Sequence, residues 1–269
     1  MKFRDRLLVR GRSAAMAVLP PKAAIAALAW SKWYAGEREM RLLPLLCDRD
    51  LTSVDVGANA GVYTWHLRRL TRVVHAYEPI PELAACLRSN LPGCVVHECA
   101  LSSEVGTALL RIPIYAGSQV GALASLSHDF DGAESIREIE VPMRRLDDEG
   151  LDRLGFIKVD AEGHERRVLA GAKEILARDH PTLLVEIEER HAPGAIDGVV
   201  GDLAALGYGA YFLGEDGLRP ISEFDRDKMQ DATMMGADGW ATGTYINNFV
   251  FLPRTAAWPG QCRLLGGRD

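Results

Sequence analysis

The stretch SVDVGANAG, residues 53–61, decides the fold of this 269-residue chain. Residues 51–56 are rich in valine and predict a buried strand, whereas residues 62–70 repeat apolar side chains at helical spacing. Gly57 and Gly61 lie between them and predict a tight turn whose backbone a ligand can approach closely. The first N–H groups of the following helix are unpaired and can bind a polar ligand. The stretch therefore predicts a strand, a nucleotide-binding turn and a helix.

An acidic residue after the next strand narrows the choice of nucleotide. The strand expected at residues 73–77 runs into Glu78 and Pro79, and a carboxylate at that strand end suits the two hydroxyls of a ribose. The dinucleotide fingerprint G-x-G-x-x-G is not met, because its second and third glycine positions hold Asn59 and Val62. The remaining pattern is typical of Rossmann-like class I enzymes that bind S-adenosylmethionine. An ordinary strand, turn and helix without a ligand is the alternative.

Size, charge and cysteine content limit the class of protein. A chain of 269 residues suits one large α/β domain with additions. The net charge of −6 argues against a nucleic-acid-binding protein that relies on bulk electrostatics. The five cysteines lack C-x-x-C spacing. We therefore expect reduced thiols in a cytoplasmic protein rather than disulfides or a zinc site.

Residues 1–45 are expected to form an N-terminal helical arm. Within them, residues 1–36 carry seven lysines or arginines and one acid, beside an apolar run that Pro20 and Pro21 interrupt. A membrane-spanning helix needs about 20 apolar residues, so this interruption predicts two short helical pieces packed on the domain or on a partner subunit. Two alternatives are a secretory signal and a peripheral membrane contact by residues 1–36, in which basic residues flank an apolar face.

Strand and helix patterns alternate over residues 46–255, which we assign to one domain followed by a C-terminal tail, residues 256–269. Seven strands are expected, at residues 51–56, 73–77, 94–99, 156–160, 182–188, 208–213 and 248–252, with helices at 62–70, 81–91, 165–177 and 196–206. A β-hairpin insertion at about residues 104–146 and a polar loop at about residues 214–247 interrupt the alternation. The pattern predicts an α/β fold with a doubly wound, mostly parallel seven-stranded sheet.

With these elements in place, the chain resembles the FkbM family of S-adenosylmethionine-dependent methyltransferases. The matching blocks are VDVGANAG (54–61), AYEPIPE (76–82), ECALS (98–102), RRLDD (144–148), FIKVDAEGHE (156–165), GA (171–172) and LLVEIE (183–188). They follow the family's order over roughly residues 50–190, and residues 1–45 and 214–269 carry no family block. The resemblance implies a class I methyltransferase that methylates oxygen, often on a sugar or polyketide hydroxyl.

The expected donor site lies at the carboxyl ends of the parallel strands, where ligands of such sheets bind. The residues assigned to S-adenosylmethionine are Asp55, Gly57, Ala58, Asn59, Gly61, Glu78, Pro79, Ala100, Leu101 and Asp160. Glu78 is expected to accept hydrogen bonds from both ribose hydroxyls. Asn59 can adopt the left-handed backbone that the turn requires. Pro79, Ala100 and Leu101 could enclose the adenine.

Methyl transfer is an in-line displacement, so the site must hold the acceptor in line with the methyl group. An alcohol acceptor also loses its proton during attack, which calls for a general base. Asp160 is the first candidate for this role, followed by His164 and Glu186. Asp160 and Glu186 could instead hold a divalent ion such as Mg²⁺, but we assign no residue as a metal ligand. Trp240, Tyr245, Asn247 and Asn248 are candidates for acceptor contacts.

The sequence thus favours an O-methyltransferase acting on a hydroxyl of a glycan, glycolipid or secondary metabolite. The alternatives are an N-methyltransferase of a peptide or small amine, a nicotinamide-dependent oxidoreductase, and a cofactor-binding module without catalysis. The broken glycine fingerprint and the lack of a Tyr-x-x-x-Lys pair argue against the oxidoreductase. We expect a cytoplasmic protein, with membrane association through the arm and oligomer formation left open.

Overall fold

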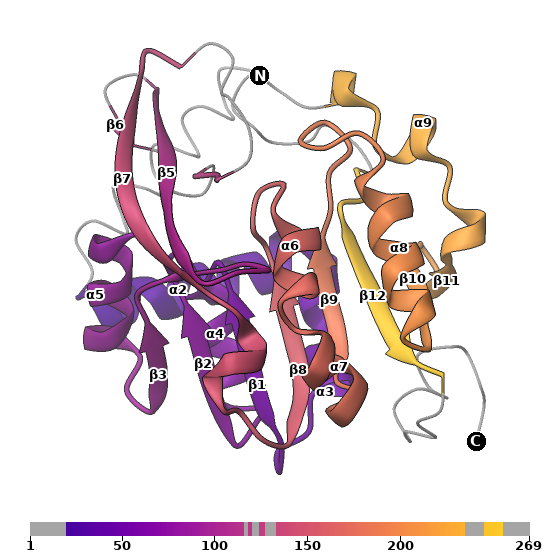
Figure 1. Ribbon diagram of the computed structural model, residues 1–269, viewed down its shortest axis with the longest axis horizontal. Helices are drawn as coiled ribbons and strands as arrows, with labels where there is room; N and C mark the ends of the chain where they lie inside the picture. The colour runs from indigo at the N-terminus through magenta and orange to yellow at the C-terminus, as the bar shows by residue number, and fades with distance from the viewer. Residues whose placement is uncertain (1–19, 116–117, 120–123, 127–132, 235–244, 255–269) are drawn as a thin grey trace.

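The computed structural model describes residues 20–115, 118–119, 124–126, 133–234 and 245–254 (Figure 1). Several expectations therefore concern residues outside the described ranges. They are those for residues 1–19, most of the loop at 116–130, residues 235–244 with Trp240, and the C-terminal tail. Within the described ranges the chain forms an α/β fold, with a large twisted sheet between two layers of helices and a long hairpin standing above one edge (Figure 1).

The central sheet has strand order β11-β10-β12-β9-β8-β1-β2-β3. Its strands are β1 (Thr52–Val56), β2 (Val73–Tyr77), β3 (Cys94–His97), β8 (Leu154–Val159), β9 (Thr182–Glu186), β10 (Tyr208–Leu213), β11 (Leu218–Pro220) and β12 (Asn248–Pro253). The five strands from β3 to β9 run parallel, and β12 pairs antiparallel with both β9 and β10. The doubly wound, mostly parallel sheet is confirmed. The predicted number of seven strands is wrong for the described residues, because the short strand β11 pairs antiparallel with β10 and adds an eighth.

Helices cover both faces of this sheet. They are α2 (Pro21–Ala35), α3 (Leu43–Leu46), α4 (Val62–Leu67), α5 (Pro81–Asn90), α6 (Glu165–Ala170), α7 (Lys173–Asp179), α8 (Ala195–Ala205) and α9 (Arg226–Met229), with short 3-10 turns at Arg38–Leu42, Leu146–Glu149, Ile221–Glu223 and Ala232–Met234. Helices α6, α7 and α8 lie on one face, and α2, α3 and α4 lie on the other (Figure 1). Successive side chains of a strand point to opposite faces of the sheet. In β1, Val54 and Val56 pack against the layer of α6, α7 and α8.

The insertion forms the predicted β-hairpin. Strands β5 (Gly106–Tyr115) and β7 (Ser135–Arg144) pair antiparallel along their length, and β4 (Ala100–Leu101) and β6 (Ser118–Gln119) complete a four-stranded sheet. Strand β4 follows β3 directly, so the hairpin is anchored at the carboxyl edge of the central sheet. This position brings the hairpin over the end of the sheet where a ligand is expected (Figure 1).

The proline pair of the arm marks the start of a helix. Helix α2 begins at Pro21, as expected for the second of the two predicted helical pieces, whereas the first piece lies outside the described residues. Proline suits the first position of a helix because its missing N–H would have no partner there. Ile25 and Ala29 are buried against Trp65 of α4 and Leu87 of α5. In the described ranges, no helix is long and apolar enough to cross a membrane.

A glycine divides the helix that was predicted at residues 165–177 into α6 and α7. A Cβ atom on Gly171 would lie 2.0 Å from the carbonyl oxygen of Ser102. The backbone N–H of Asp147 also donates to the Gly171 carbonyl at 2.9 Å. The close approach of two other segments at Gly171 therefore interrupts the helix, which the sequence periodicity alone did not show.

We expect Gly171→Ala to lower the free energy of unfolding by about 1–3 kcal/mol, the usual range for overpacking a tight site. Gly201→Ala is the matched control, since Gly201 lies in α8 and its Cβ would meet nothing within 4 Å. That change is expected to stabilise the protein by about 0.5–1 kcal/mol, because alanine is the better helix former. Urea titration followed by circular dichroism measures both, and equal effects of the two changes would contradict the prediction.

Candidate active site

A pocket opens at the carboxyl ends of β1, β2, β4 and β8, with the hairpin forming its far wall. It contains about 620 Å³ of space, including its open mouth. The lining residues are Val56, Gly57, Asn59, Tyr77, Glu78, Pro79, Ile80, Cys99, Ala100, Leu101, Leu110, Ala124, Leu126, Asp160, Ala161, Glu162 and His164. Most of the residues predicted to bind the donor or to act on the acceptor are therefore brought together in one place.

The turn after β1 has a left-handed backbone at three positions, among them Asn59, for which it was predicted. Gly57, Asn59 and Gly61 all have left-handed backbones, with φ values of 72°, 48° and 81°. Gly57 is additionally required by space, because a Cβ there would lie 1.9 Å from the Asp160 carbonyl oxygen. Of the turn residues, Gly57 and Asn59 line the pocket. Ala58 is buried, and Gly61 immediately precedes α4, so their assignment to the donor stays a prediction.

Asp55 lies behind the turn rather than in the pocket. Its carboxylate is buried and accepts a hydrogen bond from the Thr64 hydroxyl at 2.5 Å. Burial raises the pKa of Asp55 to about 6, and Asp160 adds to the rise. Asp55 therefore ties strand β1 to helix α4 and places one more negative charge beneath the turn, while its direct contact with the donor stays a prediction.

Glu78 follows β2 and is buried at the edge of the pocket. One carboxylate oxygen accepts from the backbone N–H of Asn59 at 2.7 Å, and the other accepts from that of Ile80 at 2.8 Å. Each oxygen keeps a second acceptor position. Burial raises the pKa of Glu78 to about 7, and the negative charges of Asp55 and Asp160 contribute to the rise. The geometry holds two acceptor atoms in fixed positions, which suits two neighbouring hydroxyls.

Apolar side chains form the part of the pocket next to Glu78. Ile80 follows the acid, Ala100 and Leu101 belong to β4, and Leu110 comes from the hairpin strand β5. Ile80, Ala100 and Leu110 also belong to one apolar cluster with the hairpin. A flat aromatic base fits between such walls, so the site joins acceptors for a ribose to an apolar slot for adenine. The residues present therefore fit an adenosyl ligand.

A group that the sequence analysis missed supports the floor of this slot. Tyr77 lines the pocket and stacks on His97, with ring centroids 4.3 Å apart. Its hydroxyl donates to Glu149 at 3.2 Å, and Glu149 also lies 3.3 Å from a ring nitrogen of His97. These residues come from three separate segments, so only the fold brings them together.

Asp160 and Glu186 form a carboxyl pair at the ends of β8 and β9. Each carboxyl group acts on the pKa of the other, and the two can form a hydrogen bond when one of them carries a proton. Burial raises the pKa of Asp160, and the negative charge of Glu37 adds to this, whereas the positive charge of Lys158 opposes it. Asp160 lines the pocket and Glu186 stands behind it. The pair is thus a proton-sharing unit with one member facing the ligand space.

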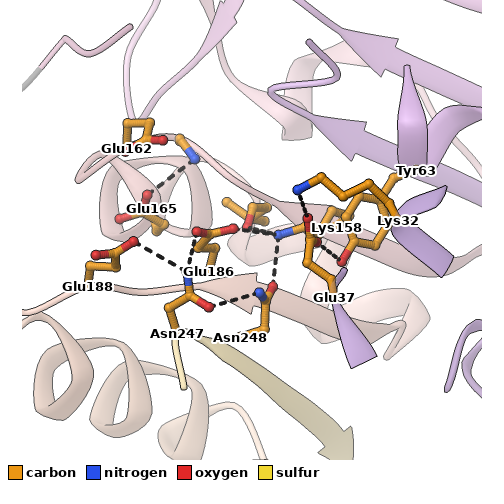
Figure 2. Close-up of polar contacts among 12 residues, drawn as sticks. Lys32, Glu37, Tyr63, Lys158, Glu162, Glu165, Glu186, Glu188, Asn247 and Asn248 are labelled. Carbon is orange, nitrogen blue, oxygen red and sulfur yellow. Dashed lines mark hydrogen bonds and ion pairs between the residues drawn. The ribbon is translucent and has the colours of Figure 1, made fainter. Parts of the chain in front are cut away.

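Lys158 is a second feature that the sequence analysis did not identify. It is fully buried within β8, where its ammonium donates to Asn248 at 3.1 Å and lies 3.7 Å from Glu186. Figure 2 shows Glu186 and Asn248 on one side of this ammonium and Glu37 on the other. A lysine between apolar residues of a central strand was the available signal, because such a charge is buried only with partners.

His164 lines the pocket but is held by its own partner. The residue is buried, and a ring nitrogen lies 3.0 Å from the Ser102 hydroxyl. Burial, with a smaller contribution from the positive charge of Arg167, lowers the pKa of His164 to about 4. Its imidazole is therefore neutral at pH 7 and binds a proton weakly, which makes His164 a poorer base than an ionised carboxylate of the Asp160–Glu186 pair.

The asparagines predicted to contact an acceptor are bound to other residues. Asn247 donates to Glu186 at 2.5 Å and to Glu188 at 3.3 Å, and Asn248 is the partner of Lys158 (Figure 2). Tyr245 donates to Glu188 at 2.9 Å. These side chains hold the carboxylates behind the pocket, and none of them lines it. In the described part of the chain, no three potential ligands are grouped so that they could hold a metal ion.

The loop after β8 is fixed by contacts from both sides. Glu162 has a left-handed backbone, with φ 47°, and its carboxylate lies 3.4 Å from a ring nitrogen of His191. The Ser125 hydroxyl of the hairpin loop donates to the Glu162 carbonyl at 2.6 Å. Glu165 accepts from the N–H groups of Ala161 and Gly163. This part of the pocket therefore has a rigid acidic wall that reaches the hairpin.

Comparison with known proteins gives consistent matches. The family model described as "Methyltransferase FkbM domain" matches residues 55–208. The 31-O-demethyl-FK506 methyltransferase FkbM of Streptomyces tacrolimicus is 31% identical over 186 residues, which cover 56% of this chain and 68% of that protein. Methyltransferase 1 of Beauveria bassiana is 28% identical over 141 residues, covering 44% of this chain and 57% of the relative.

Solved structures show more distant similarity. The crystal structure of methyltransferase FkbM from Methylobacillus flagellatus has a TM-score of 0.48 and 16% identity, and the match covers 82% of this chain and 47% of that one. A Streptococcus mutans protein solved in complex with SAH has a TM-score of 0.43 and 10% identity, covering 80% of this chain and 95% of that one. This chain thus spans about half the length of the Methylobacillus structure.

Proposed function

The chain belongs to the FkbM methyltransferase family, and we propose that it transfers the methyl group of S-adenosylmethionine to a hydroxyl of a glycan, glycolipid or secondary metabolite. Support for an oxygen acceptor comes from the carboxyl pair Asp160–Glu186, which places a proton acceptor beside the donor pocket. The Streptomyces relative is named for a substrate that lacks a methyl group on oxygen.

The residues divide into those that bind the donor and those that handle the acceptor. When bound, S-adenosylmethionine supplies a methyl group on a positively charged sulfur. Glu78 would accept hydrogen bonds from the two ribose hydroxyls, while Ile80 and Leu101 would enclose the base. Asp160 would orient the acceptor hydroxyl and take its proton as the O–C bond forms and the C–S bond to the donor breaks. Glu186 and Lys158 keep the Asp160 carboxyl in place.

Ligand binding is the first test of this proposal. Thermal shifts would be measured with S-adenosylhomocysteine, S-adenosylmethionine, NAD and NADP. A ligand at 100 times its dissociation constant adds about 2.7 kcal/mol to stability, or roughly 5–10 °C for a chain of this size. We expect shifts with the two adenosyl sulfur compounds alone. A shift only with NAD or NADP would overturn the donor assignment.

A screen with [¹³C-methyl] S-adenosylmethionine then identifies the acceptor class. Sugars, glycolipids and polyketide alcohols would be offered beside peptides and small amines, and the product's methyl carbon shift distinguishes O–CH₃ from N–CH₃. We expect O–CH₃. An N–CH₃ product would favour the alternative in which the acidic pocket attracts a cationic amine, and it would contradict the hydroxyl acceptor while leaving the donor assignment intact.

The pH dependence of donor binding follows from the pKa of Glu78. Ribose hydroxyls donate to the ionised carboxylate, and burial raises the pKa of Glu78 to about 7. Binding therefore favours the deprotonated form, so the affinity for S-adenosylhomocysteine should increase as the pH rises from 6 to 8. Isothermal titration calorimetry at several pH values measures the trend, and affinity that falls over this range would contradict the role of Glu78.

A membrane contact through the arm is a further part of the proposal. Trp30 and Tyr34 of α2 stack on each other and are 46% and 69% exposed. Amphipathic aromatic side chains of this kind bind at membrane surfaces, and the seven lysines and arginines among residues 1–36 suit anionic lipids. We expect Trp30→Ala with Tyr34→Ala to reduce flotation with phosphatidylserine liposomes. Equal flotation of variant and parent would contradict the contact.

A further inference from the structure

We propose that Lys158 and Glu37 are positioning residues that set, with opposite signs, the charge of the Asp160–Glu186 pair. This inference rests on the proposed function, because it assigns the pair to the reaction centre. Glu37 lies outside residues 55–208, the part of the chain that the family model matches. The inference therefore makes the segment after α2 a contributor to the active site.

Lys158 provides a fixed positive charge. Its side chain is fully buried, donates to Asn248 and Val159, and lies 3.7 Å from Glu186. The ammonium also lies 5.1 Å from the centre of the Tyr63 ring. Because this side chain is shielded from bulk solvent, its positive charge is screened weakly and acts strongly on neighbouring carboxyl groups. This field favours the ionised form of Asp160 and Glu186.

Glu37 provides the opposing charge. Its carboxylate accepts from the Tyr63 hydroxyl at 2.6 Å and from Lys32 at 3.1 Å, and it lies beside the Lys158 ammonium (Figure 2). Burial acts to raise the pKa of Glu37, but Lys32 and Lys158 lower it below its ordinary value. Glu37 is therefore ionised near neutral pH. Its negative charge disfavours the state in which Asp160 and Glu186 are both ionised.

The other ionisable groups around the pair also contribute charge. Those that act on Lys158 or Asp160 are Glu37 and Glu39 of the arm, Asp55 of β1, Glu78 after β2, Glu162 and Glu165 after β8, and Glu186 and Glu188 at β9. All of these are acids. Lys158 therefore acts against a surplus of negative groups, and its loss should cause the pair to bind a further proton.

The charge of the pair can be read through the donor. S-adenosylmethionine carries a positive sulfur that S-adenosylhomocysteine lacks, while the ribose, base and amino-acid groups are shared. We therefore divide the dissociation constant of S-adenosylhomocysteine by that of S-adenosylmethionine. This ratio isolates the attraction of the site for the positive sulfur. Glu78 contacts groups that both ligands share, so the direct effect of its titration on ribose binding cancels in the ratio. The ratio should fall as the pair is protonated, at a midpoint pH that reports its affinity for protons.

The experiment measures this ratio by calorimetry between pH 5 and 9 for the parent protein and four variants. Lys158→Met should move the midpoint up by about 1–3 pH units, and Glu37→Gln should move it down by up to about one unit. Glutamine keeps the oxygen that accepts from Tyr63, so Glu37→Gln tests the inference even where Lys158→Met fails to fold. The exposed Lys173→Met and Glu215→Gln make the same charge changes away from the pocket and should leave the midpoint unchanged.

Opposite shifts for Lys158→Met and Glu37→Gln would support the inference. A purely structural role would weaken both ligands equally and leave the ratio and its midpoint as in the parent, which would overturn the inference. Shifts of the same sign would also overturn it. Failure of the parent to bind either ligand would instead overturn the proposed function, so the two failures are distinguishable.

Discussion

Asp160→Asn should reduce the rate of methyl transfer by about 100- to 10,000-fold, the range expected when a general base is lost. The asparagine side chain would keep the shape and one acceptor oxygen, but it could not take the proton of an alcohol. Affinity for S-adenosylmethionine should change by less than about tenfold, since Glu78 and the apolar walls are untouched. The expected result is therefore a loss in turnover that far exceeds the loss in binding.

Single-turnover transfer of labelled methyl from prebound donor separates these two effects. Asp216→Asn is the matched control, because Asp216 is exposed in the turn between β10 and β11. Its rate should equal that of the parent. Unchanged transfer by Asp160→Asn would remove this residue from the mechanism. His164→Gln offers a comparison, because a larger loss there would assign the base to His164 instead.

Glu78→Ala should weaken donor binding by about 1.5–3 kcal/mol, which corresponds to roughly 10- to 150-fold in the dissociation constant. The variant removes the acceptors of the ribose hydroxyls. It also leaves the buried N–H groups of Asn59 and Ile80 without the oxygens to which they now donate. The turn after β1 would therefore lose a tie to the end of β2, and part of the lost affinity would come from its reorganisation.

Calorimetry with S-adenosylhomocysteine at pH 8, where Glu78 is mostly ionised, measures this loss. Glu82→Ala is the control, since Glu82 lies four residues further on, in the first turn of α5, and its side chain is 61% exposed. Urea titration of both variants shows whether the fold is retained. Parent-like affinity in a folded Glu78→Ala variant would contradict the assignment of the ribose site.

Much of the fold could be predicted because it depends on local patterns. The strands expected at residues 73–77 and 208–213 have those bounds in the structure, as β2 and β10. The left-handed backbone at Asn59 was likewise predicted from residue type. Strand β11 was not found, because a three-residue edge strand carries too little periodicity. The break at Gly171 was missed because the contact that causes it comes from Ser102, far away in the sequence.

Part of the candidate site could likewise be predicted from local sequence patterns, and part could not. Glu78, Gly57 and Asp160 were found from their positions at strand ends, since every parallel strand presents its carboxyl end to the same edge of the sheet. The partners of the Asp160–Glu186 pair were not found. Glu37 lies more than a hundred residues before Lys158, and no pattern in either segment refers to the other.

The sequence by itself determined the family, and it predicted the edge of the sheet where a ligand binds and the acid that would bind the ribose, because short segments carry those signals. Only the tertiary structure decided which charges meet. It buried Lys158 between Glu186, Asn248 and Glu37, and it held His164 against Ser102. The physical reason is that a pKa depends on burial and on charges within a few ångströms, and both are properties of the packed chain.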